Sequence, residues 1–365
     1  MLKFKDILTI GIAVLIAGCS GDDITAEGSL EGKDYDPVGT PVQFSVGIEG
    51  KATTRAVADM ANGGRFVCTM YYKPSETGQY YVLPAHYGGS MKTAWLQIYG
   101  SGKAKYMDHK FTAEATSLFW GNRWSHVFLA LADYNKLTTN IGATSAGGSQ
   151  GKLKMYPNND KQPTENIYDL TRGALTSMVG QPDPILAKTI KAPVGDPSAE
   201  ANRVTLNFEH QFAQIQVNVK NKAENNPAID ASMISKVELL GVSTEGYVTT
   251  RIDNNGNVSA ATCNNVTNDF NMFVMDTPES GYLKSFNAIA FGHLTSIRVT
   301  WDDGSSHTST LSVNSNLASG TKYVYNLEIS RTAVTTRGDI GNRSNASEQV
   351  NIKDVEITNW PVKFE

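Results

Sequence analysis

The sequence predicts an all-β protein made of two β-sandwich domains in tandem, and three observations support this. Short segments of alternating apolar and polar residues recur from Pro41 onward, separated by Gly, Pro, Asn and Asp clusters. The chain contains 32 Gly and 15 Tyr, which favours strands joined by frequent turns. Four prolines between Gly180 and Asn202 indicate a crossing between domains. We therefore expect an N-terminal domain over residues 41–200 and a C-terminal domain over residues 201–365.

The first 18 residues have the features of a bacterial export signal. Lys3 and Lys5 provide a positive start, and an apolar run of about a dozen residues follows, which is shorter than the ~20 needed to span a bilayer. The end of this run, Ile16–Cys19, resembles the lipobox of bacterial lipoproteins. We therefore expect residues 1–18 to be a signal peptide and Cys19 to carry palmitate and other acyl chains in the outer membrane. The alternative is a plain secretory signal in which Cys19 is incidental.

An acidic linker is expected over residues 19–40. It carries six acidic side chains against one lysine as far as Asp36, and such a composition stays solvated. The stretch Ser20–Asp23 resembles the export signal of surface lipoproteins in Bacteroidetes. The predicted location is therefore the exposed face of the outer membrane, and an ordinary linker is the alternative.

The first strand of the N-terminal domain is expected at residues 41–49. Its apolar face consists of Val42, Phe44, Val46 and Ile48, which alternate with polar residues and glycine. A stretch of small and basic residues containing Arg55 follows at once. Two interpretations stay open, because this stretch is either an ordinary loop or a tether that makes the strand detachable.

The remaining strand patterns follow in chain order. A short helix is expected within 167–179, and the first half of the sequence otherwise predicts strands within residues 64–73, 78–87, 95–100, 103–111 and 124–134. The second half predicts strands within residues 203–221, 235–243, 246–253, 270–275, 287–292, 296–304, 305–313, 322–330 and 349–365.

The clearest pattern lies at residues 203–221 and changes its phase. Apolar side chains occupy one parity up to Phe212 and the opposite parity from Ala213 onward. A strand has a strict period of two, so the pattern predicts a bulge or bend at this point.

The sequence gives no sign of catalysis, so we expect no enzyme. Phosphate-binding loops, zinc-binding H-E-x-x-H and the serine nucleophile elbow are missing, and the six histidines lack metal-ligand spacing. We expect no cofactor and no metal site. A net charge of -4 gives no basic footprint for nucleic acid. Cys68 and Cys263 are far apart, and whether they pair stays open in an oxidising compartment.

Three tryptophans suggest a second kind of function. Trp95, Trp120 and Trp124 are the types of side chain that stack on sugars. The alternative hypothesis is therefore a surface-exposed glycan-binding lipoprotein that is not polymerised, although tryptophan in a sandwich commonly lies in the core.

Several short patterns, in order, resemble the fimbrillin family, which comprises type V pilus subunits and related surface lipoproteins of Bacteroidales. The strongest is "VTLNFEHQFAQIQVNV", and the others are "VQFSVGIEGKATTRA", "GTKYVYNLEIS" and "VEITNW". The first pattern places these residues at family positions: Leu206, Phe208, His210, Ala213, Ile215, Val217 and Val219.

The resemblance implies a fold, a maturation step and an assembly mode. The fold would be two transthyretin-like β-sandwich domains, and the function a structural subunit of a cell-surface fimbria that supports adhesion to a host or bacterial target. A trypsin-like, Arg-specific protease would cut between Arg55 and Ala56 and release the strand with Val42, Phe44, Val46 and Ile48. The groove would then accept a strand from another pilin subunit.

The resemblance leaves more than one candidate for the donor strand. The family uses a C-terminal segment, and the candidates here are Val355, Ile357, Trp360, Val362 and Phe364. Only Pro361–Glu365 follow the expected last strand, and Pro361 removes a backbone donor. The last strand itself, swung outward, is the alternative. A subunit that accepts a strand and gives none would suit a tip or minor position, and an uncut Arg55 would leave a lipid-bound anchor.

Overall fold

The computed structural model describes the greater part of the chain from residue 39 onward. The described residues are 39–47, 64–82, 93–99, 102–107, 117–133, 165–169, 177–178, 181–196, 200–223, 228–243, 245–249, 252–258, 262–263, 269–302, 304, 306–332 and 347–360. All of them fall within one compact unit, Asp36–Glu365. Every regular element assigned among them is a β-strand, which confirms the predicted all-β class.

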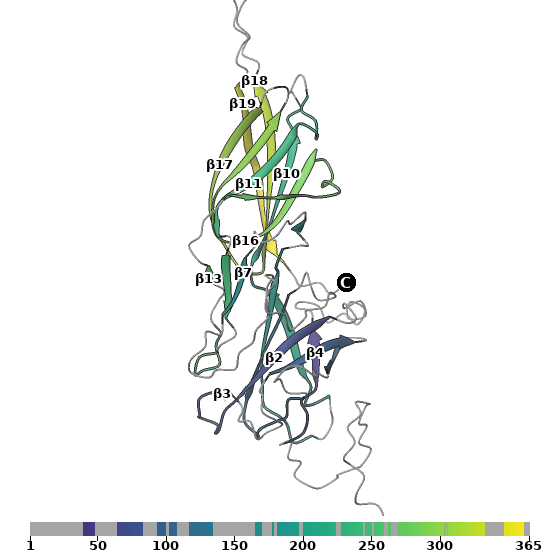
Figure 1. Cartoon of the computed structure of the whole chain (residues 1–365), viewed down its shortest axis with the longest axis vertical. Helices are drawn as coiled ribbons and strands as arrows, with labels where there is room; N and C mark the ends of the chain where they lie inside the picture. The colour runs from purple at the N-terminus through teal and green to yellow at the C-terminus, as the bar shows by residue number, and fades with distance from the viewer. Residues whose placement is uncertain are drawn as a thin grey trace, which may run out of the picture. The chain divides into compact units, whose positions relative to one another are not determined.

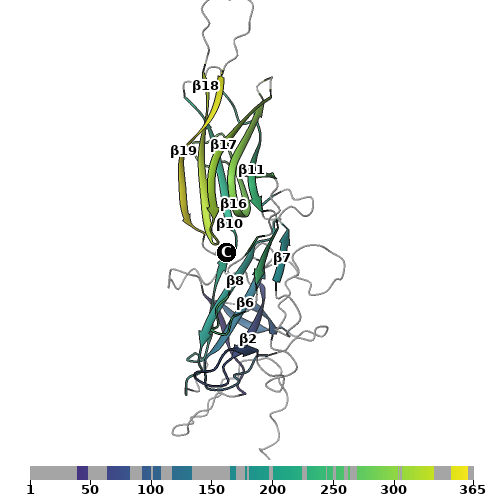
Figure 2. The same ribbon diagram turned by 90° about the vertical axis from the view of Figure 1, so that its left-hand side faces the viewer.

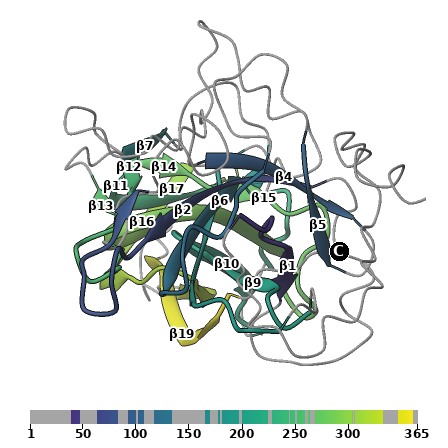
Figure 3. The ribbon, with the colours of Figure 1, turned by 90° about the horizontal axis from the view of Figure 1, so that it is seen from below.

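The first sheet contains eight strands and closes on itself. Its strands are β1 (Phe44–Gly47), β2 (Arg65–Tyr72), β3 (Tyr81–Val82), β4 (Thr93–Tyr99), β5 (Lys103–Tyr106), β6 (His126–Asp133), β8 (Pro184–Lys191) and β9 (Val204–His210). They pair in the order β3-β2-β4-β5-β1-β9-β8-β6, and β6 also pairs with β2. That last pairing turns β2, β4, β5, β1, β9, β8 and β6 into a ring (Figure 3).

The ring encloses an apolar core, and β6 shows how the sequence builds it. Phe128, Ala130 and Ala132 point into the ring, whereas Val127 and Leu129 lie in a second cluster on the other face. The strand expected within residues 124–134 is therefore confirmed, and its apolar residues are buried on both faces.

The second sheet is built around one long strand. Its strands are β10 (Ala213–Asn221), β11 (Ile234–Ser243), β14 (Phe270–Asn271), β15 (Phe273–Val274), β16 (Lys284–Asp302), β17 (Ser306–Leu317), β18 (Thr321–Thr332) and β19 (Ser347–Asn359). The order is β14-β11-β16-β10-β18-β19, with β15 and β17 also paired to β16. Figures 1 and 2 show β18 and β19 side by side at one edge.

β16 serves two ladders, which makes this part a β-sandwich. Its residues up to Ala290 pair with β10 and β15, and its residues from Phe291 onward pair with β11 and β17. The change falls next to Gly292, whose φ of +87° is a conformation that glycine adopts without strain. Side chains from both ladders meet in one core that includes Phe286 and Trp301.

A small third sheet contains β7 (Glu165–Asp169), β12 (Glu245–Thr249) and β13 (Thr262–Cys263) in the order β13-β12-β7. The prediction of a short helix within 167–179 is wrong for residues 167–169, which belong to β7. Residues 165–169 form a strand because they pair with β12, which lies about 80 residues away in the sequence. The local propensity of the segment contains no information about this partner.

The predicted break at Phe212 is confirmed, and it is a change of sheet. β9 ends at His210 in the first sheet, and β10 begins at Ala213 in the second. Phe212 stacks on Phe291 with ring centroids 4.4 Å apart, and its carbonyl accepts a bond from the Gly320 N–H at 2.9 Å. β9 lies after residue 200 yet pairs in the first sheet, and the division of the chain into two domains at that residue stays a prediction.

Among the residues that the structure describes, no helix is long and apolar enough to cross a membrane.

We expect Phe286→Ala to lower the free energy of unfolding by about 3–5 kcal/mol, because Phe286 is fully buried in the second sheet. Val274 lies opposite Phe286 in the ladder but is 49% exposed, so Val274→Ala should change stability by less than about 0.5 kcal/mol. Urea denaturation of both variants measures this contrast. Equal losses in the two variants would contradict the assigned core.

Candidate strand-exchange site

β1 occupies an interior position of the closed sheet, between β5 and β9. It runs antiparallel to β5, where Phe44 lies opposite Ala104, and parallel to β9, where Phe44 lies opposite Val204. The chain just before β1 is also bonded into the sheet, since the Val42 N–H donates to the Leu118 carbonyl at 2.8 Å. β1 therefore closes a gap between two strands that do not otherwise pair in the described ladders.

The apolar face predicted for this strand points into the core. Val42 and Phe44 are 0% exposed and Val46 is 3% exposed. Phe44 makes edge contacts with the rings of Phe128 at 5.5 Å and Tyr106 at 6.1 Å. These three side chains thus fill pockets of the first core, as the alternating pattern predicted.

Side chains of the neighbouring strands also hold the backbone of this segment. The Tyr106 hydroxyl donates to the Val42 carbonyl at 2.6 Å, and burial raises the pKa of Tyr106 well above its usual range. The Arg203 guanidinium donates to the Phe44 carbonyl at 3.3 Å, and the Ser45 and Thr205 hydroxyls are 3.1 Å apart. Side chains of the first sheet and of the residues next to it therefore help to hold the backbone of β1 in place.

Loss of β1 would open the ring and leave an apolar groove. Each buried side chain that left the core would forfeit about 1.5–3 kcal/mol of burial free energy. The edges of β5 and β9 would present unpaired backbone groups, which attract another strand. The arrangement can therefore accept an extended peptide in place of β1.

Some predicted site residues lie outside the described residues. These are Cys19, Ile48, Arg55, Ala56, Val362 and Phe364. Their roles in lipidation, cleavage, displacement and donation stay predictions.

The described candidate donor residues lie on β19 or directly after it. Val355 and Ile357 are exposed by 44% and 62%, although they pair with Tyr325 and Tyr323 of β18, which are buried. Trp360 is half-buried, and its ring stacks on the imidazole of His210 with centroids 3.7 Å apart. β19 therefore carries apolar side chains that its own sheet does not cover.

The core beneath β1 is closed by an aromatic cluster. Trp120 contacts Phe128 at 5.4 Å and His126 at 5.1 Å, and the Gly121 N–H donates to His126 Nε2 at 3.2 Å. Trp120 is only 1% exposed, so it cannot stack on a sugar. The alternative of a sugar-stacking platform is therefore wrong for Trp120, whose ring lies in the core against His126 and Phe128. Trp124 is 39% exposed, and the side chain of Trp95 lies outside the described residues.

Two further sequence candidates are core residues. His210 is buried, and its Nδ1 lies 2.9 Å from a carboxylate oxygen of Asp183. Cys68 is a free thiol within the first core, and burial raises its pKa. The side chain of Cys263 lies outside the described residues.

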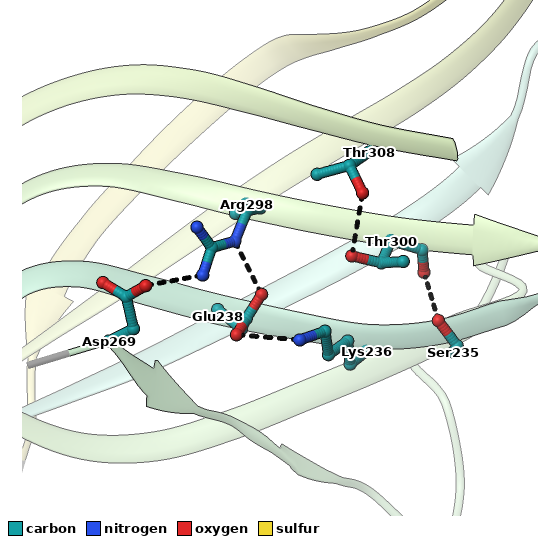
Figure 4. A network of polar contacts seen from close by, with 7 residues as sticks. All are labelled: Ser235, Lys236, Glu238, Asp269, Arg298, Thr300 and Thr308. Atoms are coloured by element: carbon teal, nitrogen blue, oxygen red, sulfur yellow. Dashed lines mark hydrogen bonds and ion pairs between the residues drawn. The ribbon is translucent and has the colours of Figure 1, made fainter. Parts of the chain in front are cut away.

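A polar network lies on β11 and β16 of the second sheet (Figure 4). Glu238 accepts bonds from Arg298 at 2.7 Å and Lys236 at 3.0 Å, and Arg298 also donates to Asp269. The bond from Arg298 lowers the pKa of Glu238. Glu238 and Arg298 are a cross-strand pair of opposite charge, and Lys236 lies two residues from Glu238 on the same strand. Within the described ranges no group of three or more His, Cys, Asp or Glu is placed to hold a metal ion.

We expect Phe44→Ala to lower the free energy of unfolding of the uncleaved chain by about 3–5 kcal/mol, because its fully buried ring fills the first core. Gln43→Ala is the matched control, since Gln43 is exposed on the same segment and should change stability by less than about 0.5 kcal/mol. Thermal and urea unfolding check both values. A small effect of Phe44→Ala would show that β1 contributes little to this core.

We expect the first sheet to lose stability in mild acid because of His126. Burial lowers its pKa from 6.5 to about 4, so the unfolded chain binds a proton in this range while the folded chain does not. The free energy of unfolding should therefore fall as pH drops from about 6.5 towards 4, by about 3 kcal/mol in total from this group. Urea denaturation at several pH values measures the slope, which should shrink in His126→Asn. An unchanged slope in that variant would assign the acid sensitivity elsewhere.

Comparisons with known proteins identify a family and solved structures with the same fold. The fimbrillin-like family model matches residues 54–360, whereas a search of curated proteins finds no match. A proposed cell adhesion protein from Bacteroides uniformis is 13% identical with a TM-score of 0.50, covering 89% of this chain and 99% of its own. One from Bacteroides ovatus is 15% identical with a TM-score of 0.50, covering 88% and 97%. These two structures support the fold, and the family match shows that the chain belongs to the fimbrillin-like family.

Proposed function

We propose that this protein is a structural subunit of a cell-surface fimbria that is assembled by strand exchange and supports adhesion. It is exported as an outer-membrane lipoprotein through Cys19, cut after Arg55 by an Arg-specific trypsin-like protease, and joined to other pilin subunits. The function is architectural and involves no catalysis, cofactor or metal.

One observation carries this proposal, namely the position of β1. A strand near the start of the described residues lies inside a closed sheet, with Val42, Phe44 and Val46 buried, and Arg55, the proposed cleavage site, follows it in the sequence. A strand that merely decorated the sheet would lie at an edge. Because β1 fills a gap between β5 and β9, its release creates a site that only another extended segment can fill.

Strand donation from one subunit to the next is a heterologous contact. Each copy uses one end to give and another surface to accept, so the contact repeats without closing and produces a fibre. Membership in the fimbrillin-like family supports this function for the chain. The two solved structures with the same fold are proposed cell adhesion proteins, which agrees with a role at the cell surface.

The uncut form has a role of its own in this proposal. While β1 is in place, the groove is occupied and the subunit stays monomeric. Lipidation at Cys19 would hold this precursor on the outer membrane until cleavage after Arg55 separates the folded part from the lipid. Assembly is thereby confined to the surface of the cell.

We expect mild trypsin treatment of the chain from Ser20 onward to cut first after Arg55 and to produce polymers. The cut product should begin at Ala56, as N-terminal sequencing measures. Its Cys68 thiol, which lies in the core that contains Phe44, should react with a maleimide much faster once β1 has left, in a Cys263→Ser background. Size-exclusion chromatography and electron microscopy detect the polymers.

The matched control is Arg55→Gln, which should resist the first cut, keep Cys68 protected and stay monomeric. A cut product that begins at Ala56 but remains a monomer with a protected Cys68 would overturn the proposal. If Arg55→Gln forms polymers equally well, assembly does not require cleavage after Arg55.

A further inference from the structure

β17 lies at an edge of the second sheet and lacks the features that commonly keep such edges from pairing. In the ladders of the described residues it pairs with β16 alone. Its twelve residues, Ser306–Leu317, include no Lys, Arg, Asp, Glu or Pro. A long uncharged edge strand is a template for a further strand, and natural proteins commonly block it with charged residues, proline or a bulge.

β19, which ends the strand order of the same sheet, shows what such protection looks like. Lys353, Asp354 and Glu356 are exposed on it, and a register shift interrupts its ladder with β18. The ladder between β17 and β16 is instead regular over Ser306–Ser312 and shifts only beyond it, next to Asn314, whose φ is +50°. Ser306–Ser312, here named the β17 edge, is thus a regular and uncharged stretch.

The sequence of the β17 edge is nearly a palindrome. It reads S-H-T-S-T-L-S, which is the same in both directions except that His307 and Leu311 exchange places. Its two threonines and the serines at its ends are exposed, whereas the other three residues, His307, Ser309 and Leu311, are half-buried. A contact related by a two-fold axis requires the same patch on both partners. The β17 edge meets this requirement about Ser309, which is a small residue.

We propose that β17 of a second copy of this chain adds to the β17 edge, antiparallel to it and related by a two-fold axis at Ser309. In this register Ser309 lies opposite Ser309 of the second copy, and Thr308 lies opposite Thr310 of the second copy. The second sheet then continues from one copy into the next. β17 belongs to the second sheet and β1 to the first, so this contact is separate from the strand-exchange site.

The exposed face of the proposed contact consists of hydroxyl groups. Pairs of threonines directly opposite each other stabilise antiparallel strands. The subunit already contains such a pair on this face, since the Thr300 and Thr308 hydroxyls are 3.5 Å apart (Figure 4). Arg298 lies opposite Thr310, and its guanidinium is bonded to Glu238 and Asp269 of its own subunit. Its charge is therefore matched without help from the second copy.

The half-buried face of the contact brings apolar groups together. The His307 ring stacks on the buried Trp301 ring with centroids 5.5 Å apart, and Leu311 packs against the second core. In the proposed register Leu311 of the second copy lies opposite His307. The exchange of these two letters in the palindrome thus places an imidazole beside an aliphatic side chain at both ends, and no like charges meet there.

The contact is weak for a single pair of subunits and becomes strong only by repetition. A ladder of seven residues without a buried aromatic anchor is a small interface, so the uncut chain is a monomer when dilute. In a fibre the β17 edge recurs on every subunit, and many such contacts act together. Side-by-side pairing of fibres therefore rests on the proposed function, whereas the pairing of two single copies does not.

The test is disulfide trapping at high protein concentration in the uncut chain from Ser20 onward, with Arg55→Gln and Cys263→Ser. Ser309→Cys places a thiol directly opposite its own counterpart. Thr308→Cys places a more exposed thiol about 7–8 Å from its counterpart on the diagonal, which is too far for a disulfide. We expect Ser309→Cys to form linked dimers at least about tenfold faster than Thr308→Cys, whereas random collision favours the more exposed thiol.

Lysine substitutions provide an independent readout. Thr308→Lys with Thr310→Lys places like charges opposite each other and should weaken dimerisation at least about tenfold, as sedimentation equilibrium measures. Asn351→Lys with Thr358→Lys adds the same charge to exposed positions of β19 and should dimerise like the parent.

Three outcomes overturn the proposed contact. These are no linking of Ser309→Cys, linking of Thr308→Cys that is as fast or faster, and dimerisation that tolerates both lysines on β17. All three are measured without cleavage after Arg55, so they leave the proposed strand exchange intact. A cut parent chain that forms no polymers overturns strand exchange and leaves this contact intact.

Discussion

The pairing of β1 with β5 on one side and β9 on the other is the interaction on which the first sheet depends. Without it β5 and β9 have no partner between them, and the ring of strands is open. The same pairing brings Phe44 against Phe128 and Tyr106 and so completes the core. One four-residue strand thus completes both the hydrogen-bonded ring and the apolar core. Its removal would therefore lower the stability of the sheet and would also open a groove that another strand can enter.

The second sheet depends on a different constraint, the crossing between His210 and Ala213. Phe212 packs on Phe291, and Gln181 bonds to both backbone groups of Ile289, with distances of 3.1 and 2.7 Å. Trp360 adds its stack on His210. The Trp360 ring, which follows β19, therefore lies against this crossing.

Several features followed from the sequence because they are local. The alternation of Val42, Phe44 and Val46 is a property of neighbouring residues, and it predicted a buried strand face correctly. The change of parity at Phe212 predicted a break in the ladder for the same reason. The sequence left two places open for Trp120, a sugar-stacking surface or the core, and its burial against Phe128 and His126 decides for the core.

The sequence by itself determined the all-β class, the first strand, the break at Phe212 and the resemblance to the fimbrillin family. Only the tertiary structure decided that β1 lies inside a closed sheet, that Ser45 contacts Thr205 across 160 residues, and that Pro41 sits where no N–H is needed. The reason is physical: a period of two in a sequence reports which face of a strand is buried. The choice of neighbouring strands depends on long-range contacts whose free energies that period does not contain.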